Sequence, residues 1–317
     1  MIHATLQQLR LFDAVARHKS ITQAVEEVHL TQPAVSIQVK RLEEKVGMPL
    51  IEHIGKKLHL TNAGEEVFRA CHDVMQRLGS LETALDDLRG EVSGALNVTV
   101  VSSAKYFMPQ MLGSFVRRYP KVEPRLQITN RAKLLSRLSG NEDDLYVTGR
   151  VPDDIDVVDY PFLENVLVVV ARPDHPLVGE QNITLERLAR ERIIGRESGS
   201  GTRKAIEGMF EKEGLKVSPY IELDSTEAIK QGVIGGLGIA ILSLHSLRLE
   251  LEANALAVLE VKGFPLYRQW YAVHRKGKRL SNAARAFLEY LEQEGENELA
   301  HFLKGSEAQK FDRLKRG

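Results

Sequence analysis

Apolar positions recur at helical spacing in two short segments near the start of the chain. Ser20 and Gln23 have the S-x-x-Q spacing of a capping box, which predicts a helix that begins there. After a His-Leu turn, Thr31 or Gln32 caps a second helix, with Pro33 in its first turn, where a missing N–H costs nothing. Intervals of four, three and four residues separate the members of one buried stripe on this helix: Val35, Val39, Leu42 and Val46.

The opposite face of the second helix carries mostly amide, hydroxyl and cationic groups, which bond to base edges and phosphates. It consists of Gln32, Pro33, Ser36, Ile37, Lys40 and Arg41. Helix-turn-helix proteins insert their second helix, N-terminus first, into the major groove. A surface helical hairpin with a polar face is the alternative, and the pattern alone leaves the two interpretations about even.

Two flanking segments favour DNA binding. Upstream, an apolar stripe predicts a first helix that covers the back of the pair: Leu6, Leu9, Phe12, Val15 and Ala16. Downstream, residues 50–60 predict a hairpin with Gly55 near its tip, and Lys56 and Lys57 there can touch phosphate or the minor groove. Residues 1–61 are therefore expected to form a winged helix-turn-helix domain.

A heptad seam continues through residues 62–92 and predicts one long helix, which Thr61 or Asn62 can cap. Its members are Val67, Cys71, Val74, Leu78, Leu81, Leu85, Leu88 and Val92. So narrow a stripe needs a partner helix. Packing against the same chain is the alternative, but the position directly after a DNA-binding domain favours the same helix of a second subunit. A two-fold dimer would present two recognition helices to a pseudo-palindromic site, an interrupted inverted repeat in double-stranded DNA.

Strand and helix patterns alternate in residues 93–293, so an α/β effector-binding domain of parallel sheets with crossover helices is expected. Its size predicts two lobes, of which lobe I comprises about residues 93–163 and 267–293, and lobe II about 164–266. The strands expected include 96–100, 125–128, 144–148, 155–160, 166–170, 192–195 and 239–242, and the helices 109–119, 202–212, 226–234 and 281–291. The tail, residues 294–317, is charged and either forms a peripheral helix or is disordered.

Four loops after these strands combine hydroxyls, glycine N–H groups and cations, which suits a small anionic effector. The candidates are Ser102, Ser103, Lys105, Asn130, Arg131, Gly149, Arg150, Arg196, Ser200, Thr202 and Arg203. Each loop alone is an ordinary helix entry, but five cations on four potentially convergent loops favour a pocket. A phosphorylated or carboxylated metabolite is the simplest ligand.

Composition excludes several classes of function but indicates no further site. The 317 residues hold 43 Lys and Arg against 43 Asp and Glu, so DNA contact must come from a local patch. The single cysteine, Cys71, lies on an apolar stripe and is expected in a core rather than in redox chemistry. No secretory signal, membrane span, metal-ligand spacing or catalytic motif is recognisable, so a cytoplasmic protein that is not an enzyme, without cofactor or metal, is expected.

Residues 5–292 resemble the LysR-type transcriptional regulators. The most specific match is LQQLRLFDAVARHKSITQAVEEVHLTQPAVSIQVKRLEEKVGMPLIE, followed by KKLHLTNAG. The resemblance implies a winged helix-turn-helix regulator, dimers that pair into a tetramer, contact with RNA polymerase, and a two-lobed effector domain of periplasmic-binding-protein type. By position, Gln32, Pro33, Ser36 and Ile37 match base-reading residues, and Lys56 and Lys57 match the wing. Ile37 stands where arginine or glutamine is common.

The effector region is similar to regulators of carbon-fixation operons, the CbbR, RbcR and CmpR subgroup. The similar segments include SSAKYFMPQML, NRAKLLSRL, RESGSGTRKAIEGMF and GFPLYRQWYAVHRKGKRLSNAARAFLEYL. The similarity implies control of RuBisCO, Calvin-cycle or bicarbonate-uptake genes and a phosphorylated metabolite or nicotinamide nucleotide as effector. Tyr146 departs from the smaller residue expected there, so it faces either the core or the cleft. A regulator of another metabolic operon, a solute-binding protein and an α/β enzyme are the alternatives.

Overall fold

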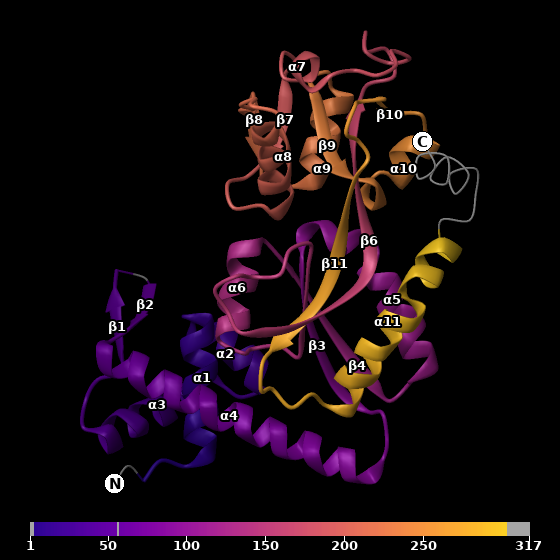
Figure 1. The fold of residues 1–317 in the computed structure, drawn as a ribbon. Helices are drawn as coiled ribbons and strands as arrows, with labels where there is room; N and C mark the ends of the chain where they lie inside the picture. Colours follow the sequence, from indigo (N-terminus) through magenta and orange to yellow (C-terminus); the bar gives the residue numbers. More distant parts are fainter. Residues whose placement is uncertain (1–2, 56, 303–317) are drawn as a thin grey trace. The chain divides into compact units, whose positions relative to one another are not determined.

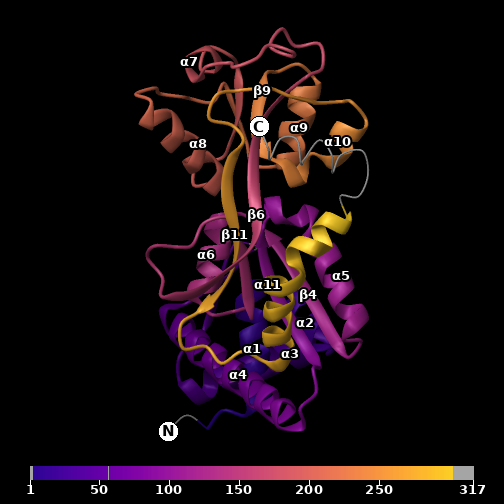
Figure 2. The same ribbon diagram turned by 45° about the vertical axis from the view of Figure 1, so that its right-hand side comes forward.

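A computed structural model describes residues 3–55 and 57–302 of the chain. The chain divides into two compact units, Met1–Leu88 (the N-terminal unit) and Arg89–Gly317 (the C-terminal unit). Each unit is held by its own buried apolar clusters. Figures 1 and 2 show the elements of each unit.

The N-terminal unit contains three short helices, a hairpin and one long helix: α1 (Leu6–His18), α2 (Ile21–Val28), α3 (Gln32–Val46), β1 (Ile51–Ile54), β2 (Lys57–Leu60) and α4 (Asn62–Arg89). Local signals set the helix ends. The side chain of Ser20 accepts a hydrogen bond from the N–H of Gln23, while His29 adopts a left-handed φ of 53° and ends α2. Thr31 precedes α3, and Gly47, with φ 76°, ends it. The helices and the hairpin predicted from the sequence are confirmed.

The core of this unit brings the three short helices, the hairpin and the start of α4 together. The predicted stripe of α3 is buried, since Val35 and Leu42 are 0% exposed and Val39 is 2% exposed. Cys71 of α4 is buried in the same cluster, and burial raises the pKa of its thiol to about 12. A thiol of that pKa is protonated near neutral pH, the opposite of a reactive thiolate. The predicted core role of Cys71 is confirmed.

One mixed sheet forms the C-terminal unit, with nine strands among the residues that the structure describes. The strand order is β4-β3-β5-β11-β6-β9-β7-β8, and β10 pairs with β6. The strands are β3 (Gly94–Val101), β4 (Val122–Thr129), β5 (Leu145–Thr148), β6 (Val157–Ala171), β7 (Ile193–Arg196), β8 (Ile221–Leu223), β9 (Ile239–Ser243), β10 (Ala257–Val258) and β11 (Leu266–Arg275).

The prediction of purely parallel sheets is wrong at the centre of this sheet. Strands β3, β4 and β5 are parallel, as are β7, β8 and β9, but β6 and β11 run antiparallel to each other and to their other neighbours. The pattern did not predict β11, because its half-exposed stretch is too mixed to stand out as a strand. The expected boundaries between lobes I and II fall on these two strands, since Leu163 is in β6 and Leu266 begins β11.

Helices cover both faces of the sheet (Figures 1 and 2). They are η1 (Ser102–Tyr106), α5 (Met108–Arg118), α6 (Arg131–Ser139), α7 (Leu185–Leu188), α8 (Gly201–Lys212), α9 (Thr226–Ile234), η2 (Leu244–Ser246), α10 (Arg248–Glu252) and α11 (Asn282–Phe302). Helices α5 and α11 lie side by side on one face, where Phe115 contacts Phe287 with ring centroids 4.9 Å apart. The helix predicted to end at Leu291 continues to Phe302, and Ser114 of α5 donates to Glu298 in the added turns over 3.0 Å. Residues 303–317 lie outside the described part of the tail.

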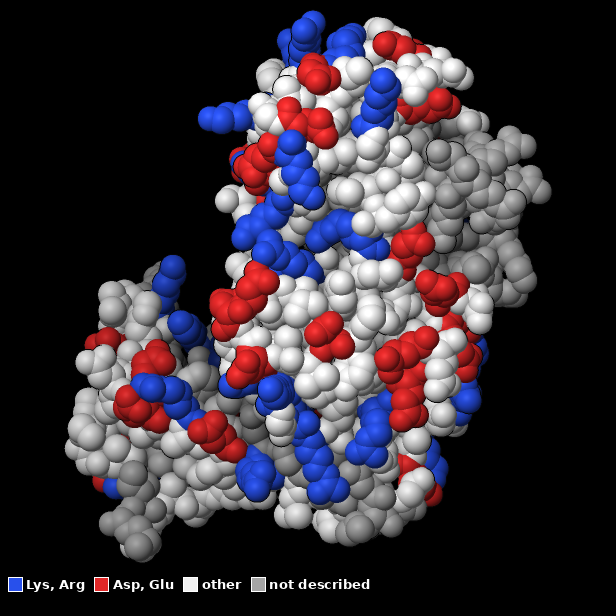
Figure 3. Space-filling view, in the orientation of Figure 1, with Lys and Arg blue, Asp and Glu red and all other residues white. Residues whose placement is uncertain are grey.

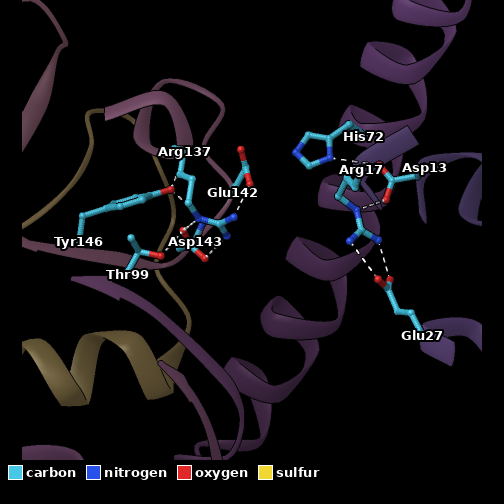
Figure 4. A network of polar contacts seen from close by, with 9 residues as sticks. All are labelled: Asp13, Arg17, Glu27, His72, Thr99, Arg137, Glu142, Asp143 and Tyr146. Carbon is cyan, nitrogen blue, oxygen red and sulfur yellow. Dashed lines mark hydrogen bonds and ion pairs between the residues drawn. The ribbon is translucent and has the colours of Figure 1, made fainter. Parts of the chain in front are cut away.

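Tyr146 of β5 faces the core and not a cleft. Its side chain is 0% exposed, in a cluster with Leu134 and Leu138 of α6. The hydroxyl accepts the N–H of Asp143 over 2.8 Å and donates to the carbonyl of Arg137 over 2.9 Å. The carboxylate of Asp143 in turn accepts from the guanidinium of Arg137 and from Thr99 (Figure 4). The bulky residue at this position therefore closes a polar network behind the sheet.

Replacing Tyr146 with Phe should lower the free energy of unfolding of the C-terminal unit by about 1–3 kcal/mol, because a buried N–H and a carbonyl lose their shared partner. Urea unfolding followed by the fluorescence of Trp270, the single tryptophan, measures this change. The control is Tyr220→Phe, since this 59% exposed ring keeps its contact with Arg192. Equal stability of the Tyr146→Phe variant and the wild type would contradict this assignment.

Candidate functional site

Some polar side chains of α3 form hydrogen bonds within the N-terminal unit, and the others do not. Glu43 accepts the N–H groups of Leu50 and Ile51 over 2.8 and 3.2 Å, which fixes the start of β1 against the helix. Gln8 of α1 bonds to both Gln38 and Lys45. These contacts hold α3 in place and leave the other side of the helix to solvent.

That other side contains the candidates taken from the sequence. The side chains of Gln32, Pro33, Ile37, Lys40 and Arg41 are exposed, and Ser36 is half-buried. Within residues 3–55 and 57–302, none of the polar members of this set has a side-chain hydrogen bond or an ion pair. Lys57 is exposed at the start of β2, while Lys56 lies outside the described residues. The free amide, hydroxyl and cations form one surface suited to base edges and phosphates.

A network of ion pairs links α1 and α2, the two helices that pack against α3, to α4 (Figure 4). Arg17 of α1 contacts Asp13 over 2.8 Å and Glu27 of α2 over 2.6 Å, and Asp13 lies 3.2 Å from His72 of α4. The hydrogen bond from Arg17 lowers the pKa of Glu27 to about 2. Burial would raise the pKa of Asp13, but the hydrogen bonds from His72 and Arg17 lower it below its ordinary value. The two carboxylates therefore stay charged at neutral pH, and their contacts fix the helix-turn-helix against α4.

The predicted seam on α4 changes character along its length. Val67 and Cys71 pack on the core of their own unit, and Leu78 is half-buried. Val74, Leu81 and Leu85 are 39%, 55% and 50% exposed. The side chain of Leu88 lies outside the described set. The later part of the seam presents apolar side chains that nothing in the described unit covers.

A cavity opens in the C-terminal unit between β11 and the segments that follow β3, β4, β5 and β7. It has about 390 Å³ of empty space, part of it open to solvent, and is lined by Val101, Ser102, Ser103, Arg131, Thr148, Gly149, Asn165, Arg196, Glu197, Ser200, Gly201, Thr202, Arg268 and Trp270. Seven of the eleven effector-binding candidates lie among them. Figure 3 shows a group of Lys and Arg side chains on this face of the unit, between α6 and α8.

Two guanidinium groups in this cavity have no carboxylate partner within the described residues. Arg131 donates to Thr148 over 3.0 Å and to the carbonyl of Arg150 over 2.9 Å. Arg268 donates to the carbonyls of Gly149 and Gly201 over 2.7 and 3.2 Å. Burial lowers the pKa of both arginines, and the positive charge of Arg150 lowers both further. A bound anion would relieve this strain between like charges.

Arg196 behaves differently, because its charge is already balanced. Only 6% of its side chain is exposed, and its Nε and Nη2 atoms donate to the two carboxylate oxygens of Glu197 over 2.7 and 2.9 Å. Nη2 also donates to Ser102 over 3.1 Å, and Nη1 to Thr226 over 3.3 Å. Arg196 thus joins η1 to α9, and the charge left for a ligand comes from Arg131 and Arg268.

Close packing behind the cavity explains the glycine after β5. A Cβ atom on Gly149 would lie 3.2 Å from the amide nitrogen of Asn165 and 3.6 Å from the indole of Trp270. Asn165 itself accepts a hydrogen bond from Ser243 over 3.0 Å. The distance to Trp270 is an ordinary van der Waals contact, whereas the distance to Asn165 is tight, so a side chain at residue 149 would require a small shift of Asn165.

The remaining four candidates point elsewhere. Arg150 pairs with Asp153, and Arg203 with Glu207 and Glu222. Asn130 caps α6 by accepting the N–H of Lys133, and Lys105 lies over the ring of Tyr106 with its Nζ atom 5.1 Å from the centroid. None of the four lines the cavity.

Sequence reasoning missed the cavity residues Asn165, Arg268 and Trp270, because they lie inside strands rather than on loops. For Asn165 the signal was a buried polar residue directly before the apolar run of residues 166–171 in β6. The mixed sequence of β11 gave no such signal for Arg268 or Trp270. In the described ranges, no group of three or more His, Cys, Asp or Glu side chains could hold a metal ion. No helix among the described residues has the length and the apolar character that spanning a bilayer requires.

Known proteins match both units. The model of the bacterial regulatory helix-turn-helix protein of the lysR family matches residues 6–65, and the LysR substrate binding domain matches residues 89–296. The RuBisCO operon transcriptional regulator of Acidithiobacillus ferrooxidans is 51% identical over 289 residues, which are 91% of this chain and 94% of that one. The transcriptional activator CmpR of Synechocystis is 49% identical over 92% of this chain and 96% of its own length.

Solved structures share the fold of this chain. The regulatory domain of Synechocystis CcmR in complex with 2-PG is 44% identical, with a TM-score of 0.61 over 63% of this chain and 96% of that one. Corynebacterium glutamicum OxyR, at 22% identity and a TM-score of 0.62 over 94% of both chains, shares the fold. The matched relatives are named transcriptional regulators, not enzymes. With both of its units matched, the chain belongs to the LysR family of DNA-binding transcriptional regulators.

Proposed function

We propose that this regulator controls genes of carbon fixation or inorganic-carbon uptake in response to a small phosphorylated metabolite. The names of the relatives that are 51% and 49% identical support the genes. The observation that carries the ligand class is the pair of half-buried guanidinium groups, Arg131 and Arg268, which lack a carboxylate partner within the described residues. A phosphate group offers the two charges and the several acceptors that such a pair needs.

The preferred ligand is 2-PG (2-phosphoglycolate), because it is bound by the CcmR regulatory domain, which is 44% identical. Its phosphate would bind Arg131 and Arg268, and its remaining polar atoms would face the hydroxyls of Ser102, Ser200 and Thr202. A nicotinamide nucleotide is the larger alternative. The ligand joins segments that follow three different strands, so binding would favour a more closed cavity and shift the population of the unit toward it.

On the DNA side, α3 would enter the major groove of a promoter with Gln32, Pro33, Ser36 and Ile37 toward the bases. Lys40, Arg41 and the wing residues Lys56 and Lys57 would contact phosphates. The exposed part of the α4 seam would pair with the same helix of a second subunit, so that two copies of α3 meet an interrupted inverted repeat. Pairing of dimers into a tetramer, contact with RNA polymerase and a cytoplasmic location complete the proposal.

Arg131→Gln and Arg268→Gln should each weaken the binding of 2-PG by about 10- to 100-fold, because a charge-assisted hydrogen bond to phosphate is lost. Trp270, the single tryptophan, lines the cavity, so its fluorescence during a titration measures the dissociation constant. Arg172→Gln is the control, since Arg172 pairs with Asp174. Unchanged affinity in both cavity variants would remove these arginines from the site.

Lys40→Ala should weaken binding to the chain's own upstream intergenic DNA and reduce the slope of log affinity against log salt by about 0.9 per phosphate contact. Gel shifts at several salt concentrations measure both quantities. Lys212→Ala removes the same charge from the exposed surface of α8 and should change neither. A slope for the Lys40→Ala variant equal to that of the wild type would place Lys40 away from the phosphates.

Leu81→Asp should raise the dissociation constant of the dimer by at least about tenfold, because a charge replaces an apolar seam residue that is 55% exposed in the single chain. Sedimentation equilibrium measures it. Arg77→Ala changes an exposed residue of the same helix that is off the seam and serves as the control. Dimers of wild-type strength would show that the subunits associate through another surface.

A further inference from the structure

Ile37 is a large apolar residue on the exposed, mostly polar face of α3. Its side chain is 52% exposed, in a row with Pro33 one turn before it and Lys40 and Arg41 one turn after it. The apolar residues that hold α3 in the unit, such as Val39, lie on the opposite face. Within the described part of the chain, Ile37 belongs to no buried cluster, so folding of the unit gives no reason for an isoleucine here.

Helix formation gives no reason either. A β-branched residue is a weaker helix former than the Lys, Gln or Arg that the neighbouring positions carry. The side chain also has no donor and no acceptor, so it cannot form a hydrogen bond with a base edge. What it can recognise is another apolar group.

The base edges in the major groove offer one such group. Guanine, adenine and cytosine present acceptors and donors there, whereas thymine adds its C5-methyl group. An isoleucine pressed against the other three edges would cover polar atoms without replacing their hydrogen bonds to water. Against thymine it removes two apolar surfaces from water at once.

From this geometry we infer that Ile37 reads the C5-methyl group of one thymine in each half-site. The inference rests on the proposed insertion of α3 into the major groove and adds what the helix selects there. Ile37 is then a specificity-determining residue that works by apolar contact, while Lys40 and Arg41, one turn away, supply affinity through phosphates.

Deoxyuridine tests this directly, because it differs from thymidine only by the missing methyl group and pairs in the same way. The probe is the footprinted segment of the chain's own upstream intergenic DNA, in which each thymine is replaced in turn by deoxyuridine. In each half-site, deoxyuridine at one thymine position should weaken binding of the wild-type full-length protein. Such a change in a single half-site should weaken binding by about fourfold, the effect of one buried methyl group. Changing both half-sites should weaken it by about 16-fold.

The Ile37→Ala variant should bind the thymine and deoxyuridine duplexes equally at that position, since the contacting side chain is gone. Ile54→Ala is the matched control, because Ile54 is an isoleucine that is 61% exposed on the wing strand β1. That variant should keep the wild-type deoxyuridine profile. In addition, replacing the cytosine of a thymine-to-cytosine mutant by 5-methylcytosine should restore about fourfold in affinity to the wild type alone.

Two results would overturn the inference while leaving DNA binding intact. One is a wild-type protein that binds every deoxyuridine duplex as tightly as the thymine duplex. The other is an Ile37→Ala variant with the same deoxyuridine profile as the wild type. Failure of the wild type to bind any of these duplexes at low salt would instead overturn the proposed insertion of α3, and the inference with it.

Discussion

The antiparallel pairing of β6 and β11 is the constraint on which the C-terminal unit depends. These strands occupy the middle of the sheet, with β5 beyond β11 and β9 beyond β6. Their register sets Arg268 opposite Asn165, and Trp270 follows two residues later on the same face, so the strands themselves bring three side chains to one cavity. A slip of β11 by one residue would turn Arg268 and Trp270 to the other face of the sheet, away from Asn165. The position of the cavity is therefore a consequence of strand register more than of loop conformation.

Charge balance then decides what the cavity can hold. Arg196 is the most deeply buried of its three arginines, and it has a carboxylate of its own in Glu197. Arg131 and Arg268 spend their hydrogen bonds on neutral groups, mainly backbone carbonyls, which orient the guanidinium groups but leave their charge uncompensated. A neutral solute would displace water from two half-buried guanidinium groups. It could not replace the stabilisation that this water gives to their positive charges. An anion replaces that stabilisation, so the site is selective before any detail of shape is considered.

Most of the correct sequence predictions depended on local signals, and most of the errors concerned the direction in which a strand runs or a side chain points. The cap at Ser20, the turn at His29 and the heptad seam each depend on neighbouring residues, so the helices of the N-terminal unit could be predicted. The loops around the cavity could also be located. Which way a loop side chain points could not, because the pairing of Arg150 with Asp153 and of Arg203 with Glu222 depends on the folded surface. Arg268 was missed for a similar reason, since the sequence does not say that β11 pairs with β6.

The first and the later turns of α4 have different surroundings, and this difference would set the spacing of the two α3 helices in a dimer. Its first turns are fixed to the helix-turn-helix by Cys71 in the core and by the contact of His72 with Asp13, so α3 and this part of α4 share one core. Its later apolar residues, Leu81 and Leu85, are free to pair with a second subunit. In such a dimer the distance between the two α3 helices follows from the angle at which the α4 helices cross. Because adjacent half-sites lie about 34 Å apart per helical turn, a small change of that angle moves one reading helix out of its groove. A first part of α4 that packs on the reading helix and a later part with exposed apolar residues are thus the two features that a repeat-reading dimer requires of this helix.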